Sequence, residues 1–190
     1  MQRCQPMAAW LIAGTILLGS SSWGQTTKPT YPESEAGLKQ FFQDILSASD
    51  AKDAQKLVTM TQSLLLPDPE AWFKKTYGDE LGAKLAVDYK NDHKNFGLSL
   101  ARLFYNLKDP KTLEIEVTCI QALDDTGAKA LQKLAIAAMK EPAPLYTASI
   151  TKEGTGAHIT LWSIVYVDGQ FRLAGKMRAV KDAGDTTPDD

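Results

Sequence analysis

The sequence predicts a single α+β domain in which helices come first and an antiparallel sheet comes last. Two observations lead to this fold class. From residue 34 to residue 107 apolar residues recur at helical spacing, and from residue 113 they alternate with polar residues as in strands. Helices and strands that are segregated along a chain are typical of α+β domains, in which helices cover one face of a sheet.

The first 24 residues have the layout of a secretory signal peptide. Arg3 precedes the apolar run MAAWLIAGTILLG, and Ser22 and Gly24 are small residues placed before a cleavage site at Gln25. The apolar run is short for a transmembrane helix, which needs about 20 residues. We therefore expect an exported, soluble protein, periplasmic or extracellular.

Charge and cysteine content exclude several classes of function. Loss of residues 1–24 removes Arg3 and no acidic residue, which leaves 20 of the 21 basic residues against 23 acidic ones, a net charge of −3. Binding to nucleic acid and attraction to anionic membranes both need basic patches, so we expect neither. Cys119 is then the only cysteine, which excludes an intramolecular disulfide and a metal site built from cysteines.

About 165 residues then remain, which is enough for one domain with a substantial core. Residues 25–33 are polar and contain two prolines, which predicts a flexible lead-in. The domain is expected over residues 34–180, and the polar residues 181–190 predict a disordered tail.

The helical half begins with two helices that we expect to form an antiparallel hairpin. Ser34 can cap the first helix, and Asp50 can cap the second, which reaches Leu65 and ends before Pro67. The apolar stripe of the first helix consists of Leu38, Phe41, Phe42, Ile45 and Leu46.

A third helix has the clearest start signal in the chain. Asp68 suits the cap, Pro69 suits the first helical position, and Gly78 can end the helix with a positive φ. A long helix is then expected over residues 79–107. Its apolar stripe consists of Leu81, Leu85, Tyr89, Phe96, Leu100, Leu103 and Leu107.

Strand patterns follow from residue 113. The run TLEIEVTCI alternates cleanly, LYTASITK predicts a second strand, and a helix is expected between them over residues 127–140. The last two strands are joined at Asp168-Gly169, which favours a two-residue turn with positive φ at both positions.

The turn at Asp168-Gly169 predicts the register of the last two strands. Tyr166 would lie opposite Phe171, and Trp162 opposite Gly175. Trp162, Tyr166 and Phe171 would then share one face, which we expect to turn inward toward the helices. The opposite, outward face would carry Leu161, Val165, Arg172 and Lys176.

Taken together, WFKKTYG on a helix and the final WSIVYVDGQFRLAGKM resemble the nuclear transport factor 2-like superfamily, in particular its small exported bacterial members of unassigned function. The resemblance spans about residues 34–179. It implies a cone-shaped α+β fold in which N-terminal helices pack in the concave face of a curved antiparallel sheet, around a pocket. It also implies a possible homodimer through the sheet, because members are often dimeric in this way.

Asp92 and His93 are the candidate catalytic residues. On the predicted long helix both flank the apolar stripe, so either could face a cavity. An imidazole that titrates near neutral pH and a carboxylate that burial makes more basic are groups that general acid–base catalysis uses. The alternative is a partly exposed polar pair at the edge of the stripe.

A candidate ligand-binding set is formed by aromatic and neighbouring side chains that could line an apolar pocket. The set is Tyr89, Phe96, His158, Trp162, Tyr166, Phe171 and Met177. The alternative is that the same side chains form the core. We expect no metal site, because two histidines are too few for a catalytic zinc, and no cofactor.

Three functions follow from these features. The leading one is an exported small-ligand-binding or accessory protein with an apolar pocket between the 79–107 helix and the C-terminal hairpin. The second is a cofactor-independent isomerase, lyase or hydrolase that uses Asp92 or His93 as acid or base. The third is a protein-interaction module without a pocket, which uses the outward face of the sheet.

Overall fold

The computed structural model describes residues 30–152 and 158–183, and it confirms the α+β class. The predicted signal peptide, residues 25–29 of the predicted lead-in and residues 184–190 of the predicted tail lie outside the described residues, as does the turn at 153–157.

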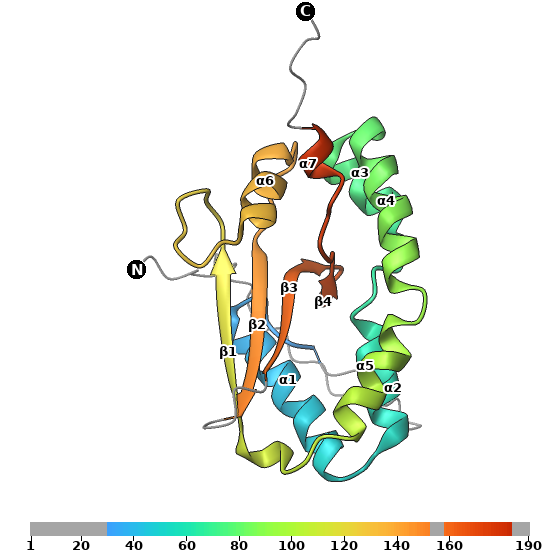
Figure 1. Ribbon diagram of the computed structural model, residues 1–190, viewed down its shortest axis with the longest axis vertical. Helices are drawn as coiled ribbons and strands as arrows, with labels where there is room; N and C mark the ends of the chain where they lie inside the picture. The colour runs from blue at the N-terminus through green and yellow to red at the C-terminus, as the bar shows by residue number, and fades with distance from the viewer. Residues whose placement is uncertain (1–29, 153–157, 184–190) are drawn as a thin grey trace, which may run out of the picture.

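Helices precede the sheet along the chain. They are α1 (Glu35–Asp50), α2 (Ala54–Ser63), α3 (Pro69–Tyr77), α4 (Asp79–His93) and α5 (Phe96–Tyr105). The remaining elements are the short 3-10 helix η1 (Pro110–Thr112), β1 (Leu113–Ile120), α6 (Ala130–Ala138), β2 (Leu145–Lys152), β3 (His158–Val167), β4 (Gln170–Leu173) and α7 (Val180–Ala183). β1 to β4 form a four-stranded antiparallel sheet in sequence order (Figure 1).

Two hydrophobic cores share this sheet. The first joins α1, α2 and α5 to one face of the strands and contains Phe42, Phe104 and Ile164. The second joins α3, α4, α6 and α7 to the other end of the strands and contains Phe73 and Val165. In Figure 1 the first core occupies the lower half of the molecule and the second the upper half. The sheet therefore holds two helical layers together.

The N-terminal helices follow local capping chemistry, with one correction. The Ser34 hydroxyl caps α1 by accepting a hydrogen bond from the Gly37 N–H, as predicted. The predicted cap at Asp50 is wrong, because α1 continues through Asp50 and Asp53 caps α2 by accepting from the Lys56 N–H at 2.9 Å. The prediction failed because the buried Ser49 donates its hydroxyl to the carbonyl of Phe104, and this tertiary contact satisfies it within the helix.

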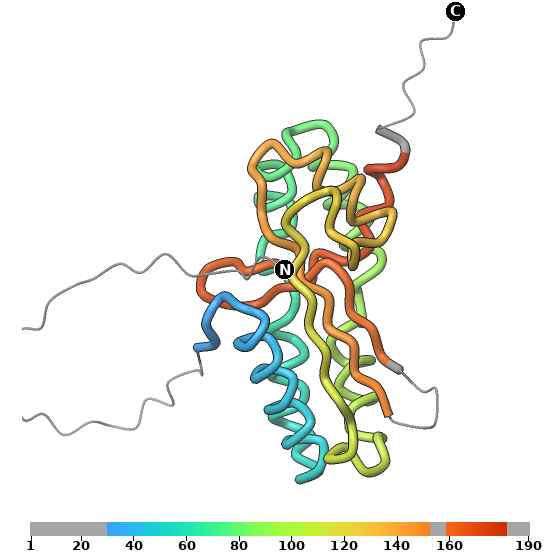
Figure 2. Tube along the Cα trace, turned by 90° about the vertical axis from the view of Figure 1, so that its left-hand side faces the viewer, coloured from blue at the N-terminus to red at the C-terminus, as the bar shows by residue number. Residues whose placement is uncertain are grey.

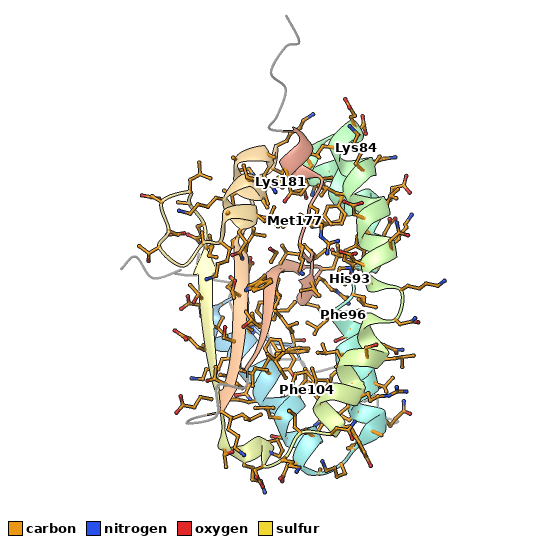
Figure 3. All side chains as sticks on the ribbon, viewed as in Figure 1. Lys84, His93, Phe96, Phe104, Met177 and Lys181 are labelled. Atoms are coloured by element: carbon orange, nitrogen blue, oxygen red, sulfur yellow. The ribbon has the colours of Figure 1, made fainter. Side chains whose placement is uncertain are left out.

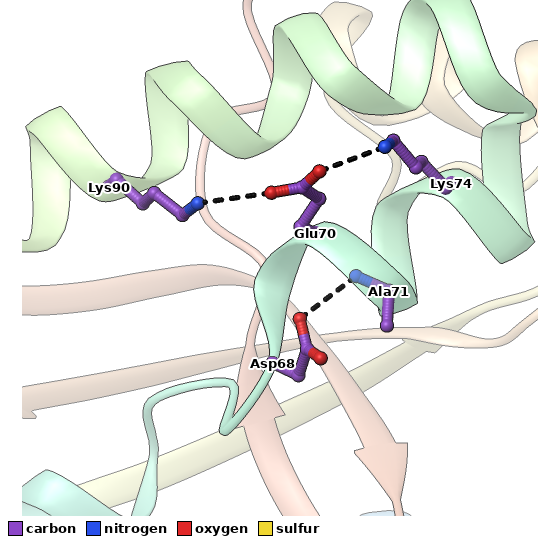
Figure 4. Close-up of polar contacts among 5 residues, drawn as sticks. All are labelled: Asp68, Glu70, Ala71, Lys74 and Lys90. Atoms are coloured by element: carbon purple, nitrogen blue, oxygen red, sulfur yellow. Dashed lines mark hydrogen bonds and ion pairs between the residues drawn. The ribbon is translucent and has the colours of Figure 1, made fainter.

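The start of α3 is confirmed in detail (Figure 4). The Asp68 carboxylate accepts a hydrogen bond from the Ala71 N–H at 3.0 Å, and Pro69 is the first helical residue. Glu70 lies between Lys74 at 2.8 Å and Lys90 of α4 at 3.3 Å, and these hydrogen bonds lower the pKa of its carboxyl group. The pair of contacts links the first turn of α3 to α4.

The predicted long helix over 79–107 is wrong, because the chain forms two helices separated at Lys94 and Asn95. Each half has its own partner: α4 packs against α3, and α5 packs against α2. The break changes the rotation of the second half about its axis. Leu103, predicted to be buried, is 46% exposed, and Phe104 is fully buried in its place.

The tight turn between β3 and β4 is confirmed, since φ is +50° at Asp168 and +74° at Gly169. The predicted register holds where the two strands pair, with Tyr166 opposite Phe171. β4 ends at Leu173, so the predicted pair of Trp162 with Gly175 does not form.

The outer edge of β4 is joined to the end of α2. The Leu173 N–H donates to the Leu64 carbonyl at 2.6 Å. The Arg172 guanidinium donates to the carbonyls of Ser63 and Leu65, so a cation lies at the carboxyl end of α2, where the helix dipole favours it. Residues 64–66 therefore cover this edge of the sheet.

A β-bulge at Ser163 corrects the predicted faces of β3. The register between β2 and β3 shifts between Tyr146 and Ala148, and Ser163 has a φ of +58°. One extra residue moves every side chain before it to the other face. Trp162 therefore lies outside the core and is 36% exposed, whereas Leu161 is buried at 8% exposure.

The bulge also removes the predicted outward face of the sheet. Leu161 lies in the first core and Val165 in the second, so neither reaches solvent. Arg172 is half-buried at the end of α2, and Lys176 alone of the four predicted residues is exposed. The four residues predicted for the interaction module therefore do not form one exposed face.

The two aspartates near the start of α2 provide a matched test of the corrected cap. We expect Asp53→Ala to lower the free energy of unfolding by about 1 kcal/mol, because it removes the cap of α2. Asp50→Ala should cost less than about 0.5 kcal/mol, because it removes only an ion pair with the well-exposed Lys111. Urea denaturation of both variants measures the difference, and an equal loss in the two would contradict the assigned cap.

Candidate functional site

Two depressions meet at Trp162, and together they form the candidate site. The first, which we call the α4 cleft, has a volume of about 420 Å³ and lies between the α4–α5 break and the C-terminal segment. It is lined by Asp92, His93, Phe96, Thr160, Leu161, Trp162, Leu173, Gly175, Lys176 and Arg178. This is the place predicted for the pocket, between the 79–107 segment and the hairpin.

Asp92 stands at the rim of the α4 cleft in an ion pair. Both oxygens of its carboxylate accept hydrogen bonds from Arg178 Nη1, at 3.1 and 2.8 Å. The Asp92 side chain is 36% exposed and that of Arg178 is 56% exposed. The pair joins the end of α4 to the segment before α7. A carboxylate held in this way is poorly placed to take a proton from a substrate.

His93 lies deeper in the α4 cleft, and its protonation is set by its surroundings. The ring stacks on Tyr89 at 4.2 Å between centroids and meets the edge of Phe96 at 5.2 Å. Figure 3 places His93 and Phe96 on the side of α4 and α5 that faces the sheet. His93 Nδ1 lies 3.0 Å from the Tyr89 carbonyl oxygen, which can only accept, so Nδ1 carries the proton. Nε2 is then left with a lone pair.

Burial lowers the pKa of His93, although the Tyr89 carbonyl and the Asp92 charge partly offset this effect. Gly175 is what gives the ring its room. A Cβ at Gly175 would lie 2.6 Å from His93 Cε1 and 3.0 Å from Nε2. The cleft therefore holds a neutral imidazole near physiological pH, which can accept a hydrogen bond or a proton.

The second depression, which we call the α6 groove, lies on the other side of Trp162 and is larger, at about 840 Å³. It is lined by Lys129, Ala130, Leu131, Gln132, Leu134, Trp162, Ser163, Lys176, Arg178 and Lys181. Its floor is apolar, and Leu134 and Trp162 expose 38% and 36% of their surfaces there. Its rim is cationic.

The wall between the two depressions is formed by Trp162, Lys176 and Arg178, which line both. The ammonium group of Lys176 lies 6.0 Å from the centre of the Trp162 ring, at the outer limit of a cation–π contact. Along this segment exposed cations alternate with the buried residues Met177 and Ala179. Burial of one side of the segment thus presents its charges to the site.

The structure divides the predicted ligand-binding set. Phe96 and Trp162 line the α4 cleft, together with the predicted catalytic pair. Tyr166 is partly buried in the first core, and its hydroxyl donates to the Tyr31 carbonyl at 2.7 Å. His158 begins β3, and its side chain lies outside the described residues.

The other three predicted ligand-binding residues are core residues, which corrects the prediction. Phe171 is buried in the first core, and Tyr89 and Met177 in the second. The Tyr89 oxygen accepts from the Leu66 N–H at 2.9 Å, and Met177 accepts from the Tyr77 hydroxyl at 3.1 Å. These contacts replace the ligand contacts that were predicted for them.

Arg178, Lys181 and the α6 side chains of the site were not predicted, and Lys176 was predicted only for the outward face of the sheet. Lys176, Arg178 and Lys181 all lie in the six-residue stretch KMRAVK. This clustering of basic residues is a signal that could have been found in the sequence. Leu131 and Leu134 are spaced as on one face of a helix, which looked like an ordinary buried stripe.

In residues 30–152 and 158–183 no group of three or more histidine, cysteine, aspartate or glutamate side chains is placed to hold a metal ion. None of the described helices has the length and apolar character needed to cross a membrane.

The sequence matches no protein-family model, and neither a curated protein nor a solved structure matches the chain. The resemblance to the nuclear transport factor 2-like superfamily therefore stays a prediction.

The lowered pKa of His93 predicts how stability depends on pH. Above about pH 6.5 the ring is neutral in both the folded and the unfolded chain. As the pH falls below that value the unfolded chain takes up the proton first, so the free energy of unfolding decreases until the pH reaches the lower, folded pKa.

Denaturation at a series of pH values measures this loss, which should become shallower in His93→Asn. NMR titration of the His93 ring is an independent check. A His93 ring that titrates at or above its ordinary value would contradict the assignment.

Proposed function

We propose that this protein binds a small anionic amphiphile, with the apolar part in the α6 groove and the anionic group at its cationic rim. The observation that carries the proposal is the combination of an apolar floor with basic side chains at one edge. An apolar pocket with a few polar or charged groups at its edge is the usual form of a small-molecule site. The volume of about 840 Å³ is in the usual range for small-molecule sites.

Charge selects the class of ligand. Lys129, Lys176 and Lys181 make no ion pair with any described side chain, and Arg178 is paired only with Asp92. An anionic head group at this rim would therefore meet cations that are not already neutralised. The hydrocarbon part would cover Leu131, Leu134 and Trp162, whose burial is favourable at roughly 25 cal/mol per Å² of apolar surface.

A cofactor-independent isomerase, lyase or hydrolase is the second candidate, and His93 is the observation that favours it. The ring presents an unprotonated Nε2 in the α4 cleft, and its lowered pKa keeps it neutral. Thr160 could hold a polar group of a substrate in the same cleft. Asp92 is the weaker member of the predicted pair, because Arg178 occupies both its oxygens.

We further propose that the protein acts outside the cytoplasm, on the evidence of the layout of residues 1–24. The intact mass of the protein purified from its own host should then be that of a chain that begins at Gln25. A mass that includes Met1 or Arg3 would contradict the proposal of export. It would leave the proposal of a binding site unaffected.

Dodecanoate is the probe for the binding site, and dodecyltrimethylammonium is its control, since it has the same chain and the opposite charge. Calorimetric titration should show dodecanoate binding at least about tenfold more tightly, because the rim is cationic. Lys176→Glu should weaken dodecanoate binding by about threefold to tenfold, and Trp162→Ala should weaken it by a similar factor.

Lys108→Glu is the matched control for charge, because it makes the same change in the link between α5 and η1, at the bottom of Figure 1 and away from the α6 groove. It should bind dodecanoate as the unchanged protein does. Equal binding by all these variants would contradict the proposed site. His93→Asn separates the two candidates, because amphiphile binding needs the cationic rim whereas turnover needs the imidazole.

A further inference from the structure

We propose that the free edge of β1 binds an extended peptide as an added strand, and that the peptide carries basic residues at alternate positions. This site is separate from the two depressions at Trp162. It rests on three observations: unpaired backbone groups along β1, a groove beside them, and two exposed glutamates on the same strand.

Among the described strands, β1 has no partner at its outer edge. The opposite edge, β4, is already covered by residues 64–66, whose Leu64 carbonyl accepts from the Leu173 N–H. Figure 2 looks onto the β1 edge, where the strand runs in front of the sheet with α1 at its left. Along its lower half no described helix or strand lies in front of it. A partner can therefore reach its backbone.

The backbone of β1 offers donors and acceptors at this edge. The Cys119 N–H faces away from β2, since it donates to the Glu35 carboxylate of α1 at 2.7 Å. In an antiparallel ladder alternate residues face the same way, so the N–H and carbonyl groups of Ile115 and Val117 also point outward. Within the described part of the chain, the N–H groups of Ile115 and Val117 donate no hydrogen bond at this edge. The bond to Glu35 shows that an N–H group at this edge can donate to an oxygen atom outside the sheet.

A groove of about 580 Å³ runs beside the same edge, between α1 and β1. It is lined by Lys39, Gln43, Leu46, Ser47, Asp50, Pro110, Lys111, Leu113, Glu114 and Ile115. Leu46 and Ile115 are buried and make its floor apolar, whereas Lys39 and Gln43 are exposed at its side. Every second side chain of an added strand would point into this groove.

Charge on the other face identifies the partner. Glu114 and Glu116 are exposed there, and neither makes an ion pair with a described residue. Opposite charges on neighbouring strands stabilise pairing, so the peptide should place lysine or arginine next to them. For a second copy of this chain, the register that pairs Ile115 with Val117 of the other copy is disfavoured, because it would bring Glu116 opposite Glu116.

A short labelled peptide of alternating lysine and valine is the probe, with two analogues in which either all valines or all lysines are N-methylated. An added strand uses the N–H groups of only one set: the valines if it is antiparallel to β1 and the lysines if it is parallel. Fluorescence anisotropy should therefore show that one analogue binds like the parent and that the other binds at least about tenfold more weakly.

Equal affinity of the two analogues would overturn the proposal, because a purely ionic contact does not depend on backbone N–H groups. The same holds for a parent peptide that does not bind at millimolar concentration.

Variants of β1 test the same contact from the side of the protein. Val117→Pro removes one outward N–H, and an edge strand tolerates proline where the N–H faces solvent. It should bind the parent peptide about tenfold more weakly. Far-ultraviolet circular dichroism checks that the variant is folded. Glu116→Gln should weaken binding by about threefold and leave the backbone contacts unchanged.

Saturating dodecanoate should not displace the peptide, because the α6 groove and the β1 edge share no residue. Each proposal can therefore fail without the other. In NMR spectra of the unchanged protein, the amide signals of Ile115 and Val117 should shift when the peptide binds. Shifts confined to residues around Trp162 would overturn the assignment to β1.

Discussion

The β-bulge at Ser163 is the constraint on which the rest of this structure depends. A regular strand would turn Leu161, Ser163 and Val165 to one face and Trp162 and Ile164 to the other. With the bulge, Leu161 and Ile164 both enter the first core, and Val165 enters the second. β3 therefore contributes side chains to both cores. The positive φ of Ser163 is the local cost of this arrangement, and the Ala174 N–H helps to hold it by donating to the Ser163 carbonyl at 2.8 Å.

The candidate site is a consequence of the same bulge. It removes Trp162 from the core and places the ring between two depressions. The chain after β4 then leaves the sheet, buries Met177 in the second core and presents Lys176 and Arg178 beside the ring. An apolar surface and a cationic rim thus meet at one place because two packing requirements, the bulge and the anchoring of this segment, coincide there.

The two cores also explain why His93 lies at the break between α4 and α5. α4 packs with α3 in the second core and α5 packs with α2 in the first, so the junction lies where the two cores meet. His93 ends α4 at that junction and stacks on Tyr89, which belongs to the second core. Its partial burial, and hence its lowered pKa, follows from this position and not from a charged neighbour.

The sequence by itself determined the α+β class, the caps at Ser34 and Asp68 and the reversal at Asp168-Gly169. Each of these depends on residues that are close in the chain, where spacing and capping chemistry decide the outcome. Only the tertiary structure decided the break before Phe96, the bulge at Ser163 and the cationic groove. These depend on which helix packs against which, and one inserted residue or one broken turn reverses the faces that periodicity predicts.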